Sequence, residues 1–337
     1  MMPSFLHPKL VNGPFDDPGL FMPFFFENRA LMFDLGNIDS LSPRYILKTS
    51  HIFITHTHMD HFAGFDRLLR LFLGRDKELH LYGPGGFLKN IEGKLAGYTW
   101  NLVENFKYCF GIRAIEVHHD HLLVNSYTCH NKFLPARGPE KKNFCGRLLE
   151  EPALTVSAAI LDHNIPCLGF SVSERFHINI IKERLLSLGL EIGPWLKQFK
   201  QALYDRQDPD SEFEVIYGKK NRAKKFVLGE LARQIALITP GRKISYIADV
   251  VYSKSNAEKI IALVKNSDHL FIEAAFLEKH RGTARKKYHL TAAQAGTLAA
   301  EAGVKQLTPF HFSPRYTGRE NLLYREAMAA FKNYTAS

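Results

Sequence analysis

Residues 52–61 read Ile-Phe-Ile-Thr-His-Thr-His-Met-Asp-His. Four side chains that can bind a metal, His56, His58, Asp60 and His61, directly follow an apolar run. This order predicts a buried strand that ends in a loop of ligands. His56 and His58 are two positions apart, so an extended backbone directs both to one side, and Asp60 and His61 can face a second centre. Neutral imidazoles with a carboxylate suit zinc or a related divalent ion, and this interpretation is favoured over a histidine-rich surface turn.

The size and charge of the chain limit its class and its partners. Its 337 residues are 45% hydrophobic, which is enough for one large core, so we expect a single domain over residues 1–337 with room for an insertion. Lys and Arg number 44 against 34 Asp and Glu, a formal net charge of +10. A basic excess favours a polyanionic partner such as nucleic acid, but by itself it concerns steering rather than fold.

The cysteines and the N-terminal segment indicate a cytoplasmic protein. The four cysteines are dispersed and form no Cys-x-x-Cys pair, so neither a disulfide framework nor a zinc knuckle is expected. The chain begins without the charged and apolar regions of a signal peptide. The apolar stretch Gly19–Phe26 is too short to span a bilayer and contains Pro23. We therefore expect a soluble protein with no membrane partner.

The pattern of apolar residues changes along the chain. Residues 98–162 are typical of strands, whereas strands and helices alternate after residue 238. This predicts two sheets packed together with helices outside, an αββα sandwich of the α/β (α+β) class. Apolar positions from Asp60 to Phe72 have helical spacing and predict one helix. Residues 190–228 include a charged stretch and the basic run Lys219–Lys225, and are interpreted as an insertion, either a solvated charged loop or an inserted substrate-binding arm.

Three further ligand types stand at the ends of predicted strands. His163 follows the apolar run Ala153–Leu161, Asp249 ends a second such run, and His311 ends a third. Singly, a strand-end histidine is more often hydrogen-bonded than metal-bound, and Asp249 can also cap the helix that follows. Together with His56, His58, Asp60 and His61 they make seven ligands, the number that a two-metal site needs when one carboxylate bridges.

These residues resemble those of a known family. The segment Thr55–His61 matches the defining motif of the metallo-β-lactamase superfamily. Later segments are similar to those of its ribonuclease Z branch, the tRNA 3′-processing endonucleases. They are Asp162–Glu174 around the third histidine, Tyr288–Ala292 around an additional active-site histidine, and Thr308–Tyr316 around a His-x-Ser-x-Arg-Tyr motif. The resemblance implies the αββα metallo-β-lactamase sandwich.

The resemblance also implies roles for individual residues. Two Zn²⁺ ions are expected, with Mn²⁺ or another divalent ion as an alternative. One ion is assigned His56, His58 and His163, the other Asp60, His61 and His311, and Asp249 bridges them. Asp60 is implied as the acid/base partner of the metal-bound hydroxide, and His289 as the group that stabilises the scissile phosphate or protonates the leaving oxygen. Glu273 is expected either to orient His289 or to be a partly buried structural residue. Implied substrate contacts are Ser313 and Arg315 near the cleaved end and Gly193 and Pro194 in the arm.

The implied function is a di-zinc phosphodiesterase, an endoribonuclease that removes 3′ trailers from tRNA precursors by metal-hydroxide attack. By the same resemblance it is a cytoplasmic homodimer with RNA as its partner. Two cations about 3.5–4 Å apart suit phosphodiester hydrolysis, but they also suit lactone, thioester and β-lactam hydrolysis. A di-metal hydrolase of another phosphodiester, a cyclic nucleotide, a lactone or a small ester is therefore the alternative.

Several segments depart from the family pattern. Ala248-Asp249-Val250 replaces the usual Gly-Asp-Thr, and Asp34-Leu35-Gly36-Asn37 keeps only the aspartate and glycine of a longer loop. These changes leave the hydrolytic residues in place and keep the alternative substrates open. A metal-free nucleic-acid-binding relative is disfavoured, because all seven ligand positions are filled. The cluster His118-His119-Asp120-His121 is interpreted as a surface feature rather than a third metal site.

Overall fold

The computed structural model describes residues 6–24, 27–135, 137–218 and 222–334. By its internal contacts the chain divides into two compact units. The first unit comprises Met1–Leu148, Val156–Val172 and Lys243–Ser337, and the second comprises Leu149–Thr155 and Ser173–Arg242. Each unit is described by itself.

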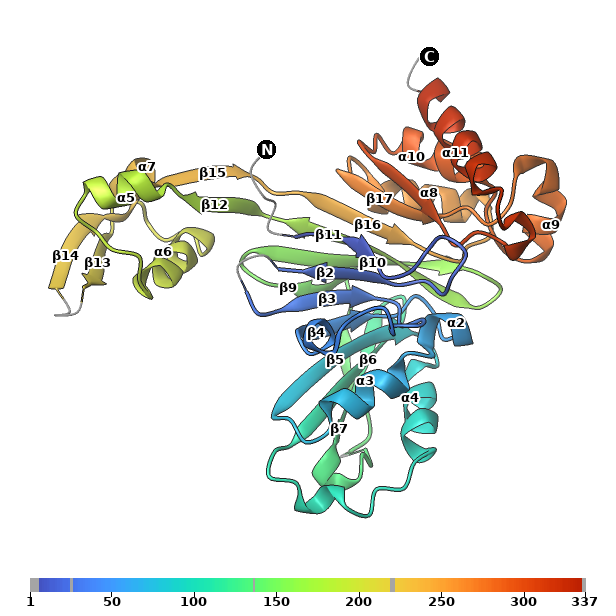
Figure 1. The fold of residues 1–337 in the computed structure, drawn as a ribbon, viewed down its shortest axis with the longest axis horizontal. Coiled ribbons are helices and arrows are strands. Elements are labelled where there is room, and N and C mark those ends of the chain that lie inside the picture. Colours follow the sequence, from blue (N-terminus) through green and yellow to red (C-terminus); the bar gives the residue numbers. More distant parts are fainter. Residues whose placement is uncertain (1–5, 25–26, 136, 219–221, 335–337) are drawn as a thin grey trace. The chain divides into compact units, whose positions relative to one another are not determined.

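The first sheet has eight strands in sequence order, β1 to β8 (Figure 1). Strands β3 to β6 run parallel, and the outer pairs are antiparallel. The strands are β1 (Lys9–Leu10), β2 (Leu20–Pro23), β3 (Ala30–Phe33), β4 (Thr49–Phe53), β5 (Lys77–Pro84), β6 (Phe110–Val117), β7 (His121–Thr128) and β8 (Glu140–Asn143).

The second sheet has six strands in the order β18-β17-β16-β11-β10-β9. Strands β16, β17 and β18 are parallel to one another, as expected for strands joined through helices. The strands are β9 (Arg147–Glu150), β10 (Leu154–Asp162), β11 (Pro166–Glu174), β16 (Lys243–Ile247), β17 (His269–Glu273) and β18 (Leu307–Phe310).

Aromatic side chains pack the two sheets of the first unit against each other. Phe33 and Phe53 of the first sheet stack at 5.0 Å, and each ring lies 5.6 Å from Phe170 on β11. Tyr246 on β16 lies 5.9 Å from Phe33. All four rings are buried. Every second residue of a strand faces the same side of its sheet, and on this side the rings meet the opposite sheet.

Helices cover the outer face of each sheet, which confirms the predicted αββα sandwich. Against the first sheet, α3 buries Phe65, Leu68 and Phe72. Helix α10, which packs on the second sheet, is almost wholly buried. The helices of this unit are α1 (Pro43–Ile46), α2 (Met59–Phe62), α3 (Phe65–Phe72), α4 (Phe87–Ala96), α8 (Lys254–Val264), α9 (Arg281–Lys286), α10 (Ala292–Glu301) and α11 (Glu320–Tyr334). Short 3₁₀ turns are η1 (Val103–Asn105), η2 (Cys129–Asn131), η3 (Glu278–His280) and η4 (Pro314–Tyr316).

The prediction of one helix from Asp60 to Phe72 was wrong, because the chain breaks between α2 and α3. Gly64 stands at the break, and its amide donates to the carbonyl of Leu35 at 2.8 Å. A Cβ atom on Gly64 would lie 2.3 Å from the carbonyl oxygen of Gly36, a distance that real Cβ atoms do not reach. This close approach between two backbone segments cannot be read from hydrophobic spacing.

Gly36 is required at the same contact, which predicts a marked loss of stability for Gly36→Ala. Its Cβ would lie 2.5 Å from the carbonyl oxygen of Asp60 and 2.7 Å from that of Pro18. Neither backbone atom can move freely, so we expect a loss of about 3 kcal/mol in the free energy of unfolding, measured with urea.

Gly93→Ala is the matched control for Gly36→Ala. Gly93 lies inside α4, and no atom lies within 4 Å of a Cβ placed there. Because alanine is the better helix former, this change should raise the free energy of unfolding by about 0.5–1 kcal/mol. Equal stability of the two variants would contradict the close contact at Gly36.

The second unit has its own hydrophobic core. Strands β12 (Phe176–Ile180) and β15 (Ala236–Pro240) pair antiparallel, as do β13 (Glu212–Tyr217) and β14 (Arg222–Val227). Helices α5 (Lys182–Ser187), α6 (Trp195–Tyr204) and α7 (Leu228–Ile235) complete the unit. Its buried core includes Leu185, Trp195, Phe199, Val215 and Leu231. The segment interpreted as an arm, residues 190–228, lies inside this unit, and Lys219 to Asn221 of its basic run lie outside the described residues.

Helix lengths also bear on membrane contact. None of the helices in the described parts of the chain combines the length and apolar character needed to cross a bilayer.

Candidate metal centre

The loop after β4 presents the histidines of the opening motif. His56 and His61 are buried and His58 is exposed at the start of the short helix α2. The amide of Leu168 on β11 donates to the carbonyl of Thr55 at 2.8 Å, so both sheets hold this loop. The ligands therefore stand where the two sheets meet at one edge.

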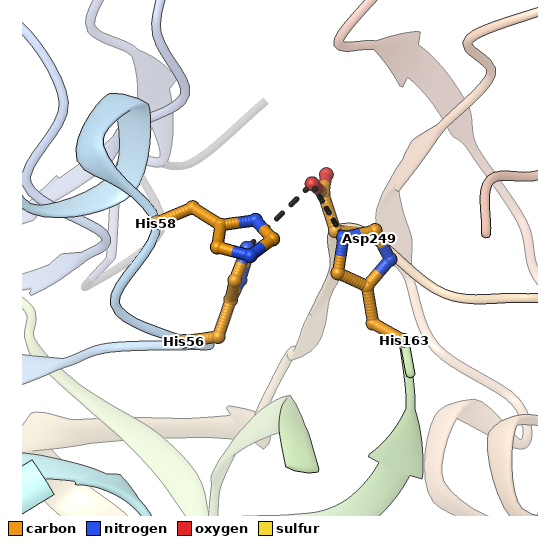
Figure 2. A group of neighbouring side chains, drawn as sticks. All are labelled: His56, His58, His163 and Asp249. Atoms are coloured by element: carbon orange, nitrogen blue, oxygen red, sulfur yellow. Dashed lines mark ion pairs between the residues drawn. The ribbon is translucent and has the colours of Figure 1, made fainter. Parts of the chain in front are cut away.

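A first group of ligand atoms gathers around Asp249, which directly follows β16 and Ala248 (Figure 2). One ligand atom each of His56, His58, His163 and Asp249 lies within 4.8 Å of the others. Oδ2 of Asp249 is 3.7 Å from Nε2 of His56 and 3.5 Å from Nε2 of His163. These distances are longer than those of hydrogen bonds, and they match the distances between ligand atoms that surround one cation.

A second group of ligand atoms lies near the same carboxylate. Asp60, His61 and His311 offer ligand atoms within 4.8 Å of one another. Nε2 of His61 is 3.4 Å from Oδ2 of Asp249, and Nδ1 of His311 is 2.9 Å from Oδ1. Asp249 thus lies between the two groups, and the structure brings together all seven residues that the sequence suggested as ligands.

The pattern of unpaired atoms fits cations at these positions. Four buried atoms here lack a hydrogen-bond partner within the described structure: Nε2 of His56, Nε2 of His61, Nδ1 of His311 and Oδ1 of Asp249. Nδ1 of His311 and Oδ1 of Asp249 are close, yet they are not aligned for a hydrogen bond. Burying unpaired polar atoms is costly, and a divalent ion coordinated by them removes that cost.

Hydrogen bonds outside the two groups orient the rings. Nδ1 of His61 donates to Asp34 at 2.9 Å, and Nδ1 of His163 donates to the carbonyl of Tyr288 at 2.8 Å. In each ring Nδ1 therefore carries a proton, which leaves Nε2 as the atom that can bind an ion. This arrangement is common among histidines that bind metals.

The backbone is strained at several of these residues. Asp34, Asp249, Tyr288 and His311 have φ between 45° and 60°, a region that residues other than glycine seldom occupy. Asp249 and His311 each follow a strand, so the turned backbone directs their side chains across the sheet edge. Such strain of about 1–3 kcal/mol per residue tends to occur at functional sites.

His289 stands beside the ligands and is held by a buried carboxylate. Its Nδ1 donates to Oε2 of Glu273 at 2.9 Å, and Oε1 of Glu273 accepts from the amide of Val250 at 2.6 Å. Glu273 has no exposed surface, so both of its oxygens are committed to orientation. Nε2 of His289 remains available to a substrate.

The charges of the site differ from one side chain to the next. Burial lowers the pKa of His56 to about 2, which keeps its ring neutral. Burial opposes ionisation of Asp60, but its hydrogen bond with His311 and the nearby imidazoles lower the pKa of Asp60 to about 2. Burial also disfavours a charged His311, yet the carboxylates of Asp249 and Asp60 raise its pKa to about 10. A cation that binds here must therefore displace a proton from His311.

A cavity of about 290 Å³ opens next to the second group. Its lining includes Asp60, His289, His311 and Ser313. Arg315 is exposed and is not among the lining residues. Gly193 and Pro194 belong to the second unit, where Pro194 precedes α6.

Sequence reasoning missed several residues of this site. The sequence marks Asp34 only as a remnant of a family loop. In the structure its carboxylate accepts hydrogen bonds from Thr55, His61 and Tyr246. Phe15, Asp16 and Asp17 line the cavity although they lie far from every motif in the sequence. The short spacing of Asp34-Leu35-Gly36 after an apolar strand was the one available signal. Lys287, which also lines the cavity, was not missed: it belongs to the basic run Arg281–Lys287 just before His289, which the sequence marks as a candidate lining of the substrate path.

Comparison with known proteins agrees with this geometry. A family profile described as "Beta-lactamase superfamily domain" matches residues 226–312. The metallo-β-lactamase fold protein YhfI from Bacillus subtilis superposes with a TM-score of 0.56 at 16% identity, covering 97% of this chain and 94% of that one. The short form of human tRNase Z superposes with a TM-score of 0.50 at 18% identity, covering 93% of each chain.

The fold and the site together define a metal-dependent hydrolase with the metallo-β-lactamase fold. A curated relative from Deinococcus radiodurans, named Ribonuclease Z, is 30% identical over 307 residues, which cover 89% of this chain and 88% of the relative. The chain belongs to the ribonuclease Z family.

Proposed function

We propose that this protein is a two-zinc endoribonuclease that removes 3′ trailers from tRNA precursors. The observation that carries the proposal is the convergence of seven His and Asp side chains beside a cavity that His289 also lines. Membership of the ribonuclease Z family supports RNA as the substrate. By the same family resemblance we expect a cytoplasmic homodimer, which sedimentation of the purified protein would test.

Each ligand group would hold one of the two ions. His56, His58 and His163 would hold one Zn²⁺, Asp60, His61 and His311 the other, with Asp249 shared. When bound, such ions supply positive charge to the phosphate oxygens and lower the pKa of a water molecule toward about 7. Mn²⁺ would fit the same nitrogen and oxygen donors.

Two side chains are placed to handle protons during phosphodiester cleavage. The carboxylate of Asp60 is 42% exposed and stays ionised at neutral pH, so it can accept a hydrogen bond from the attacking water. His289 lines the cavity. Burial disfavours its charged form, but the carboxylate of Glu273 raises the pKa of His289, so the doubly protonated ring can donate a hydrogen bond or a proton from Nε2 to the leaving oxygen. Lys287 and Ser313 offer a cation and a hydroxyl to the phosphate beside them.

We expect His289→Ala to lower kcat by roughly 10²–10⁴-fold while both ions stay bound, because the acid would be lost and the ligands kept. The rate on a 3′-extended tRNA precursor and the metal content by mass spectrometry measure the two effects. His119→Ala, which replaces an exposed histidine in the β6–β7 turn, is the control. Loss of zinc from His289→Ala would mean that this ring is a ligand instead.

Residues 190–228, which lie inside the second unit, are the proposed arm that grips tRNA. Arg222, Lys224 and Lys225 are exposed on β14, although Lys225 pairs with Glu212 at 2.8 Å. Side chains of this kind bind phosphates with a strong dependence on salt. Because α6, β13 and β14 are folded around a common core, single side chains should be changed rather than the segment deleted.

We expect Arg222→Glu with Lys224→Glu to raise KM for the tRNA precursor on the order of tenfold and to reduce its salt dependence. Hydrolysis of bis-p-nitrophenyl phosphate should not change, because that ester is too small to reach an arm. Lys141→Glu with Lys142→Glu, an exposed pair on β8 of the first unit, is the matched control. Equal weakening by both pairs would indicate nonspecific attraction to the basic surface.

One feature of the cavity favours a second candidate, a hydrolase of a small ester or cyclic nucleotide. Asp16 and Asp17 line the cavity and add negative charge where a polyanion would pass. Both carboxylates also accept backbone hydrogen bonds, Asp16 from Gly13 and Asp17 from Asn37, each at 3.1 Å. Cleavage of bis-p-nitrophenyl phosphate without cleavage of any tRNA precursor would select this second candidate.

A further inference from the structure

A separate cluster of metal-binding side chains lies at the open end of the β6–β7 hairpin, where β6 begins and β7 ends. Cys109, Cys129 and His130 each offer a ligand atom, and these atoms lie within 4.8 Å of one another. The two cysteines are distant in sequence, but β6 and β7 are antiparallel, and Gly111 pairs with Thr128 just before the cluster. All three residues belong to the first unit, and none belongs to the groups around Asp249.

His130 is held in one tautomer. Its Nε2 lies 2.9 Å from the carbonyl oxygen of Phe106, so Nε2 carries the proton and donates it to that carbonyl. The lone pair of the neutral ring is then on Nδ1. A backbone carbonyl that orients an imidazole in this way is a common companion of metal coordination. The ring is exposed, so an ion can reach it from solvent.

The sulfur of Cys129 is buried but not isolated. It accepts a hydrogen bond from the amide of Phe110 at 3.2 Å, which favours a thiolate. Burial and the neighbouring sulfur of Cys109 nevertheless raise the pKa of Cys129, because two thiolates side by side repel each other. A cation between them removes this repulsion. Cys109 itself is half-buried.

We propose that Cys109, Cys129 and His130 bind one thiophilic divalent ion, Zn²⁺ or a chemical equivalent, at a site separate from the hydrolytic centre. Two thiolates and one imidazole are a typical ligand set for zinc. A fourth position is left for water. The ion would join the ends of β6 and β7 to the segment that contains η1, because His130 already contacts the carbonyl of Phe106 there. Its role would be to stabilise this end of the first sheet.

Cobalt titration of the full-length protein tests the site. Co²⁺ bound to thiolate gives a charge-transfer absorption that His and Asp ligands do not give. We expect this band in the wild-type protein, and its loss in Cys109→Ser and in His130→Ala. Because both residues are at least partly accessible, neither change should prevent folding. Cys145→Ser, which changes an exposed cysteine outside the cluster, should keep the band.

Metal counting and alkylation complete the test. Cys109→Ser should contain one zinc fewer per chain and should hydrolyse bis-p-nitrophenyl phosphate at the wild-type rate. Zn²⁺ should slow alkylation of Cys109 on the order of tenfold, because a metal-bound thiolate is a poor nucleophile, and should leave Cys145 unaffected. Equal zinc content in wild type and Cys109→Ser, an absent cobalt band, or a disulfide between Cys109 and Cys129 in the purified protein would overturn the proposal.

Discussion

Asp249→Ala is expected to abolish hydrolysis, by at least about 10⁴-fold, and to remove bound metal from both ligand groups. The carboxylate of Asp249 lies within 4.0 Å of a ring nitrogen of five histidines, His56, His61, His163, His289 and His311. Without Asp249, both ligand groups lose the negative charge of this carboxylate.

The local charges explain why the loss should be so large. Burial opposes ionisation of Asp249, but His311 and His61 hold the pKa of this carboxyl well below its usual range. It therefore stays ionised in the interior and offsets the positive charge that gathers there. Alanine would leave the imidazoles without this partner, and repulsion among them would oppose the entry of a cation.

Metal content, activity and thermal unfolding together measure this effect. Wild-type protein treated with a chelator should also unfold at a lowered temperature, because it too lacks the ions of both ligand groups. The control is Asp120→Ala, which removes an 81% exposed aspartate that pairs with His121 in the β6–β7 turn. An Asp249→Ala protein that held as many ions as the wild type and hydrolysed the tRNA precursor would refute the shared position of Asp249.

The second large effect is expected for Asp34→Ala, which should lower the free energy of unfolding by about 3–5 kcal/mol. Asp34 has no exposed surface and accepts hydrogen bonds from the amide of Thr55 at 2.7 Å, from His61 at 2.9 Å and from the hydroxyl of Tyr246 at 3.0 Å. Thr55 follows β4 and Tyr246 lies on β16, so one carboxylate joins the two sheets. Its removal leaves buried donors without an acceptor.

The same change should weaken metal binding by about 10–100-fold, because Asp34 fixes the orientation of His61. Urea unfolding in the presence of a chelator measures stability without the metal, and zinc titration of the folded protein measures affinity. Asp34 has φ of 56°, which asparagine tolerates better than alanine. Asp34→Asn therefore separates the loss of charge from backbone strain, and it should recover part of the stability.

Tyr246→Phe is the matched control for Asp34. It removes one of the hydrogen bonds to Asp34 and leaves His61 in place, so it should cost only about 1 kcal/mol and leave zinc affinity unchanged. Zinc affinity that is the same in wild type and Asp34→Ala would show that His61 is oriented without Asp34.

The sequence by itself determined the kind of chemistry and much of the fold. Thr55–His61 follows an apolar strand, so its side chains had to emerge at a strand end. The αββα class followed from the change between strand-rich and alternating segments. Both inferences depend on local patterns, because side-chain direction in a strand repeats every two residues.

Only the tertiary structure decided which distant residues meet. His163 reaches Asp249 because β11 lies beside β16 in one sheet, and Asp34 reaches Tyr246 across the space between the sheets. Cys109 and Cys129, which appeared dispersed in sequence, come together through an antiparallel hairpin. The helix break at Gly64 likewise depends on a backbone contact with Gly36. Such contacts depend on strand order and on close packing, and neither leaves a periodic trace along the chain.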